Sequence, residues 1–147
     1  MIIPVVAMRT IRAAATKIQS QRITRRGAPA WDDAGLRREV GHLQAELDAL
    51  WAMVKLSVSE TASSGMPGLT GSAIKLFYSE LCQRTCELGL KVLGRAGLCL
   101  DDVGGLPSHQ VLFRMLQSLS LTIAAGTSQI QRNIISERIL GLPKEPR

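Results

Sequence analysis

The residues best suited to chemistry form a short run near the C-terminus, Gly126-Thr127-Ser128-Gln129. Gly126 permits a backbone turn that a residue with a Cβ would resist, and Thr127 or Ser128 can cap the helix that follows. A helix start exposes unpaired N–H groups, and a hydroxyl with the Gln129 amide beside them suits a phosphate or a ribose. Taken alone, the run fits simple helix capping better than ligand binding, because most capped helix starts bind nothing.

This run lies within Ala124–Arg147, a segment that closely resembles the C-terminal signature of the acyl-CoA dehydrogenases. In that family a Gly-Thr-Ser-x-Ile-Gln sequence opens the last helix of the C-terminal domain, and its Thr and the residue two after it touch FAD. The match continues without a gap to the Leu140–Pro143 tail, a form typical of bacterial members. The resemblance therefore implies that Gly126, Thr127 and Gln129 bind the cofactor FAD.

The same resemblance reveals a missing catalytic group. Acyl-CoA dehydrogenases remove a Cα proton from the acyl-CoA thioester with a carboxylate base while the β-hydride passes to the flavin. In many members that base is a Glu immediately before the Gly-Thr, and here the position is Ala125, whose methyl group cannot accept a proton. Other members carry the glutamate on an earlier helix, which we expect to lie outside this sequence. We therefore predict no catalytic residue in the chain.

The resemblance implies two further contacts with FAD, each with a departure from the family pattern. Arg22 takes the position of an arginine that contacts the FAD pyrophosphate, although the phenylalanine that normally follows it has no counterpart here. The family's Gln-x-x-Gly-Gly, which approaches the FAD adenosine across a subunit boundary, aligns with Lys91, Gly94 and Arg95. Only Gly94 is retained. Arg95 puts a bulky cation where close backbone approach is expected.

The positive charge of the chain is confined to its start. The net charge is +6, and residues 1–31 hold six of the 18 basic residues and none of the 12 acidic ones, so the rest of the chain is neutral. An Arg-rich, acid-free start resembles a mitochondrial presequence and also suits an arm that binds nucleic acid or a membrane surface. Because six basic groups without interleaved aromatics are few for such an arm, we expect no nucleic-acid partner.

The three cysteines do not form a recognisable site. Cys82 and Cys86 lie one helical turn apart, which does not suit a disulfide framework, and partner histidines for a metal are lacking. We expect Cys82, Cys86 and Cys99 to be reduced thiols in a reducing compartment and predict no metal site. His42 and His109 are far apart in the sequence and are predicted to be surface or interface residues.

The apolar pattern predicts helices throughout the chain, with only 3% aromatic residues and 46% hydrophobic ones. A helix is expected over 1–21. Asp32 or Asp33 caps a long second helix, whose apolar seam is Leu36, Val40, Leu43, Leu47, Leu50, Val54 and Val58. A loop over 59–72 and a helix over 72–93 follow, the helix ending at Gly94 and Gly97. Its apolar face consists of Ile74, Phe77, Tyr78, Leu81, Thr85, Leu88 and Val92.

Two more helices complete the prediction. Ser108 can cap the next one. Its predicted core face comprises Val111, Leu112, Met115, Leu116, Leu119 and Ile123. The last helix starts near Ser128 and ends near Leu140, before Gly141 and Pro143. Four charged residues lie off the apolar seam of the second helix and are expected to be solvated, namely Arg37, Arg38, Glu46 and Asp48. Glu80 and Glu87 are expected to be solvated or paired, and Glu137 and Arg138 to be surface residues or contacts between helices.

These elements predict an all-α fold, an antiparallel four-helix bundle over residues 32–147, preceded by a basic N-terminal helix and loop over residues 1–31. The bundle agrees with the C-terminal domain of the acyl-CoA dehydrogenases. Family members have a further helical domain and a β-barrel domain ahead of it, which build much of the flavin and thioester site. No apolar run reaches the length of a membrane span, so no membrane span is expected.

The leading hypothesis is a C-terminal domain that contacts FAD and oligomerises, either a fragment or a short subunit that completes a flavin site with a partner chain. The expected partners are a second copy or another acyl-CoA dehydrogenase chain, with acyl-CoA as substrate of the assembled enzyme. Acyl-chain length is not encoded in these residues. The compartment implied is the bacterial cytoplasm, or the mitochondrial matrix in a eukaryote. The alternative is a non-catalytic helical interaction module derived from the family.

Overall fold

The computed structural model describes residues 24–25, 28–65, 68, 70–102 and 108–144. Within these ranges the chain is all-α apart from two short strands, β1 (Thr24–Arg25) and β2 (Ala28–Pro29), which pair antiparallel. The α-helices are α2 (Ala34–Ser64), α3 (Gly71–Leu93), α4 (Ser108–Leu121) and α5 (Ser128–Ile134). The 3-10 segments η1 (Ala30–Asp32) and η2 (Gly94–Leu98) flank them, and the π segment η3 (Ile135–Ile139) follows α5. The predicted helix over 1–21 and Arg22 lie outside the described residues.

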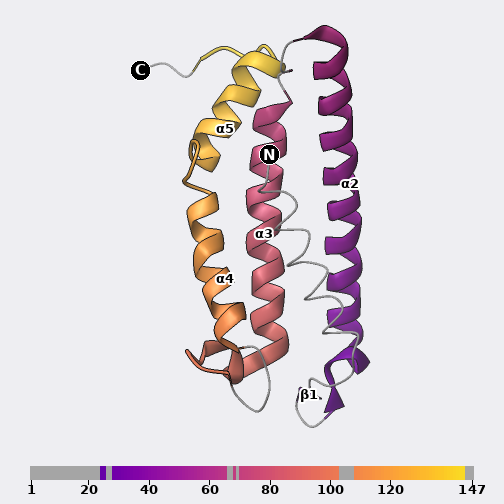
Figure 1. Ribbon diagram of the computed structural model, residues 1–147, viewed down its shortest axis with the longest axis vertical. Coiled ribbons are helices and arrows are strands. Elements are labelled where there is room, and N and C mark those ends of the chain that lie inside the picture. The colour runs from indigo at the N-terminus through magenta and orange to yellow at the C-terminus, as the bar shows by residue number, and fades with distance from the viewer. Residues whose placement is uncertain (1–23, 26–27, 66–67, 69, 103–107, 145–147) are drawn as a thin grey trace.

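The predicted all-α, antiparallel fold is confirmed. Figure 1 shows α3 in the middle, with α2 along one side and α4 followed by α5 along the other. Both α2 and the α4–α5 column run antiparallel to α3, so the four helices occupy three columns. The central helix α3 therefore contacts each of the other described α-helices, and their positions are fixed relative to it.

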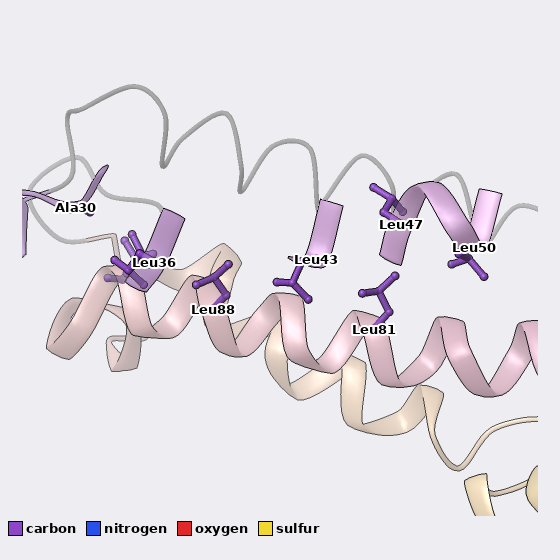
Figure 2. Packing of buried hydrophobic residues seen from close by; sticks show 9 residues of the cluster. Ala30, Leu36, Leu43, Leu47, Leu50, Leu81 and Leu88 are labelled. Atoms are coloured by element: carbon purple, nitrogen blue, oxygen red, sulfur yellow. The ribbon is translucent and has the colours of Figure 1, made fainter. Parts of the chain in front are cut away.

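Leucines from α2 and α3 form the core between these two helices (Figure 2). Leu36, Leu43, Leu47 and Leu50 are buried on α2, and Leu81 and Leu88 are among those buried on α3. Each fully buried leucine contributes about 1.5–3 kcal/mol through removal of apolar surface from water. The predicted seam is therefore confirmed in its first four turns. It is wrong at Val58, which is 57% exposed.

The start of α2 agrees with the prediction, whereas its end does not. The Asp33 carboxylate accepts hydrogen bonds from the N–H groups of Gly35, at 2.8 Å, and Leu36, at 3.2 Å, and so caps the helix. The loop predicted from Ser59 is wrong as far as Ser64, because this segment continues α2. Its hydroxyls donate to carbonyls within the helix, as Thr61 does to Ser57 O at 2.8 Å, and so do not break it.

Two predictions about α4 are also wrong. The Ser108 side chain does not cap this helix: its hydroxyl is buried and has no partner among the described residues. Asp102 instead accepts a hydrogen bond from the N–H of His109 at 3.2 Å. The predicted core face is largely exposed at Leu116, Leu119 and Ile123, since no described element covers that side. Val111 does pack against the core.

Ion pairs join α2 to α3. Arg84 binds Glu46 through its two terminal guanidinium nitrogens, Nη1 at 2.7 Å and Nη2 at 2.5 Å, and Lys91 Nζ lies 2.6 Å from Glu39 Oε1. Glu46 is thus paired across the helix interface, in contrast to the solvated position predicted for it. Partly exposed pairs of this kind contribute little free energy, about 0–1 kcal/mol each, but they favour one register of the two helices.

Candidate functional site

The predicted site residues Ala125, Gly126, Thr127 and Gln129 lie together at the corner between α4 and α5. Ala125 and Gly126 both have positive φ, +55° and +92°, so the backbone reverses here in a conformation that favours glycine. A Cβ on Gly126 would lie 2.8 Å from Nε2 of Gln131, closer than real Cβ contacts allow. The backbone angle therefore favours glycine at position 126, and a Cβ there would displace the Gln131 amide that binds the Ala125 carbonyl.

Thr127 caps α5, and Ser128 does not. The Thr127 hydroxyl oxygen accepts a hydrogen bond from the N–H of Ile130 at 3.3 Å, while Ser128 is buried within the first helical turn. A hydroxyl that accepts one bond can still donate its own proton to a ligand. Gln129 is exposed beside it. The corner thus presents a hydroxyl and an amide at or near the surface.

Three polar side chains, two from α3 and one from α5, form hydrogen bonds to the corner. Lys75, near the start of α3, donates from Nζ to the carbonyl oxygen of Gly126 at 2.5 Å. Gln131 on α5 is 6% exposed and donates from Nε2 to the carbonyl oxygen of Ala125 at 2.8 Å. Gln83 on α3 donates to the Thr122 hydroxyl at 3.3 Å. Sequence reasoning missed the roles of Lys75 and Gln83, because these residues come from a different helix and no local motif includes them.

Among the described residues, the α4–α5 corner contains no carboxylate that could serve as a base. Ala125 is exposed and ends in a methyl group. Glu80, one of the carboxylates predicted to be solvated or paired, forms an ion pair with Arg132 of α5. Glu137 lies on η3 and faces Lys144 at 3.7 Å. These acidic groups therefore serve contacts within the fold.

Gly94 and its neighbours lie at the opposite end of α3. Gly94 has φ of +57° and terminates the helix, as predicted, and no atom within 4 Å would meet a Cβ there. Nineteen residues separate it from Lys75, so the two positions are roughly 28 Å apart along the helix axis. Lys91, which replaces the family's glutamine, is already paired with Glu39. One chain therefore does not bring Gly94 and Thr127 together.

Cys82, Cys86 and Cys99 are free thiols, and the burial of Cys82 and Cys86 makes these two poor nucleophiles. Burial raises the pKa of Cys82 to about 11, an effect partly offset by a hydrogen bond with Tyr78. Burial likewise raises the pKa of Cys86. Within the described ranges no group of His, Cys, Asp or Glu side chains could hold a metal ion, and no helix is long and apolar enough to cross a membrane.

Comparison with known proteins assigns the chain to a family. The sequence profile described as "Acyl-CoA dehydrogenase, C-terminal domain" matches residues 3–140. The chain belongs to the acyl-CoA dehydrogenase family. The match covers the α4–α5 corner, so the family resemblance inferred from Ala124–Arg147 is confirmed.

Relatives from mycobacteria share this part of the family. The acyl-CoA dehydrogenase IpdE1 of Mycobacterium tuberculosis is 33% identical over 123 residues, which are 84% of this chain and 30% of that protein. IpdE1 of Mycolicibacterium smegmatis is 42% identical over 71 residues, 48% of this chain and 17% of that protein. The acyl-CoA dehydrogenase FadE34 of Mycobacterium tuberculosis is 33% identical over 94 residues, 63% of this chain and 12% of that protein. The chain thus spans less than a third of the length of these relatives.

A solved structure agrees with the fold. The crystal structure of the ChsE4–ChsE5 complex from Mycobacterium tuberculosis contains a chain that superimposes with a TM-score of 0.78 at 26% identity. The match covers 99% of this chain and 38% of that one. The arrangement of α2 to α5 is therefore that of an acyl-CoA dehydrogenase C-terminal domain.

Proposed function

We propose that this chain supplies the C-terminal, FAD-contacting part of an acyl-CoA dehydrogenase that acts on acyl-CoA thioesters. The observation that carries the proposal is the α4–α5 corner, where Thr127 and Gln129 present polar groups at the surface within the segment that matches the family. Gly126 allows the close turn that places them there.

The side chains of the corner fit the polar groups of FAD. The Thr127 hydroxyl can donate, and the Gln129 amide can both donate and accept. When bound, FAD would supply hydride acceptance, whereas these residues would only hold and orient it. Gly94 lies at the far end of α3, which supports a role toward a second FAD whose main site belongs to a neighbouring chain.

We further propose that the chain has no dehydrogenase activity alone. Ala125 cannot take the Cα proton, and the matched segment is 30% of the length of IpdE1 from Mycobacterium tuberculosis. A partner chain of the same family would contribute the remaining flavin and thioester contacts and the base. The matched crystal structure is a complex of ChsE4 with ChsE5, which supports assembly between two different chains.

The test is retention of FAD by the full chain co-purified with another acyl-CoA dehydrogenase chain, measured by flavin absorbance per protein. Gln129→Ala should weaken FAD affinity by about 3–10-fold, the value of one hydrogen bond. Asn133→Ala is the matched control, because Asn133 is also an exposed amide on α5 but lies one turn farther from the corner. Equal FAD affinity in the two variants would contradict the proposed contact, and turnover of acyl-CoA by the isolated chain would contradict its inactivity.

A second candidate is a non-catalytic interaction module derived from the family. It is favoured by the exposed apolar residues of α4, which suit protein contact, and by Ala125 at the position of the base. The same co-purification separates the two functions. An assembled complex without FAD would favour the interaction module.

A further inference from the structure

The α4–α5 corner, which carries the groups assigned to FAD, is also held by a side chain of α3. Lys75 is half-buried and binds the carbonyl oxygen of Gly126, fifty-one residues farther along the chain. Among the described residues, Lys75 is the lysine of α3 whose ammonium group donates to the backbone of this turn. A charge-assisted hydrogen bond of this kind is stronger than a neutral one.

This contact fixes the orientation of a whole peptide unit. The C=O and N–H groups of a trans peptide point in opposite directions. Holding the Gly126 carbonyl toward Lys75 therefore directs the N–H of Thr127 away from α3. Gln131 does the same to the preceding unit by holding the Ala125 carbonyl. Two consecutive peptide planes are thus set by side chains, next to Ala125, whose positive φ is costly to maintain.

The rest of the interface ties the same corner to α3. Gln83 binds the Thr122 hydroxyl, and Glu80 pairs with Arg132 of α5. Successive turns of α3 supply these contacts. Gln83 binds a residue before the corner, Lys75 binds one within it and Glu80 binds one after it. The corner therefore has little freedom to move independently of the central helix.

We propose that Lys75 is a positioning residue: by binding the Gly126 carbonyl, it holds the Ala125–Thr127 turn in a fixed orientation relative to α3. The turn in turn positions the FAD-contacting groups of Thr127 and Gln129. The proposal rests on the proposed function for the identity of the ligand but not for the mechanical role of Lys75. The role belongs to the charged donor, so arginine should preserve it and an apolar side chain of similar length should not.

The first experiment measures amide hydrogen exchange by NMR in the full chain, without flavin. Lys75→Met should speed exchange at the N–H groups of Ser128 and Ile130, which bond to Thr122 and Thr127, by about tenfold or more. Core amides of α3 at Thr85 and Leu88 should change by less than about threefold. Lys75→Arg should restore the exchange rates of the parent chain.

Lys55→Met is the control for loss of a lysine, because Lys55 is exposed on α2. It should leave all four exchange rates unchanged. If Lys75→Met does not fold, Lys75→Gln, which keeps a shorter neutral donor, gives the same comparison. Unchanged exchange at the corner, or equal acceleration at the corner and in the core, would overturn the positioning role.

The second experiment measures FAD retention in the co-purified complex. Lys75→Met should lower FAD affinity by at least about threefold, the lower end of one hydrogen bond's value, and Lys75→Arg should recover it. A corner that loosens while FAD affinity stays the same would overturn the link to FAD. Absence of FAD from the parent complex would contradict the proposed function instead, and the exchange rates would still decide the role of Lys75.

Discussion

Ala125 combines two unusual properties at one residue: it occupies the position of the family's base and has a φ of +55°. A residue with a Cβ is strained in this left-handed region, at a cost of about 1 kcal/mol or more. Ala125→Gly should therefore raise the free energy of unfolding by about 0.5–1 kcal/mol, after the greater flexibility of glycine in the unfolded chain is deducted. Urea unfolding followed by circular dichroism measures the change.

The neighbouring Ala124 provides the control. Its φ is not positive, and its N–H donates to the carbonyl oxygen of Ser120 at 2.8 Å, so it continues helical hydrogen bonding. Ala124→Gly should lower the free energy of unfolding by about 0.4–1 kcal/mol. If both substitutions shift stability in the same direction, strain at Ala125 is not the cause.

Residues of the corner differ in how far the sequence could predict them. The Thr127 cap is local, because it depends on the N–H of Ile130 three positions on, and a glycine at position 126 is itself a signal for a backbone turn, so both were predictable. The contact of Lys75 is not local, because its partner Gly126 lies 51 residues farther along the chain. The acceptor is a backbone carbonyl, which every residue has, so the residue type does not reveal the contact. Residue types alone also do not indicate that the Gln131 side chain, rather than that of Gln129, is buried.

At the scale of a helix, α2 contains an interior glycine that does not adopt a positive φ. Gly41 lies in the interior of α2, and a Cβ there would meet no atom of the described residues within 4 Å. Gly41→Ala should therefore raise the free energy of unfolding by about 0.5–1 kcal/mol through the higher helix propensity of alanine. Gly65 ends the same helix with φ of +72°, so Gly65→Ala should have the opposite effect. Thermal unfolding of the two variants tests both signs.

Helix boundaries could be predicted where one side chain or glycine decides them. Asp33 and Gly94 are such residues, and both act as expected. The end of α2 could not, because Thr61 and Ser64 favour a loop in isolation but here bond to carbonyls of their own helix. The π segment after Ile134 was also missed, since the apolar spacing of 3.6 residues does not distinguish one extra residue in a turn.

At the scale of the whole molecule, the apolar stripes of α2 and α3 pack largely against each other. Exposed apolar residues lie instead on the column formed by α4 and α5. Phe113, Leu116 and Leu119 of α4 are 57%, 58% and 45% exposed, and Ile123 and Ile130, which follow along the chain, are 67% and 50% exposed. The sequence predicted Leu116, Leu119 and Ile123 as part of the core face of α4, and it did not include Phe113. The helical periodicity of these residues agrees with the structure. Periodicity indicates which side of a helix is apolar, but not whether the surface that covers it belongs to the same chain.

Exposed apolar surface of this kind favours association, so we predict a dimer or larger oligomer at micromolar concentration. Leu116→Asp should shift the chain toward monomer, because Leu112, Phe113 and Leu119 surround it on α4 and desolvating a carboxylate among them is costly. Leu56→Asp is the matched control: Leu56 is 57% exposed on α2, where Ser59 and Glu60 are its neighbours on the next turn. Sedimentation equilibrium would show the difference. A compact monomer in the parent chain, or equal effects of both substitutions, would show that the α4 face does not drive assembly.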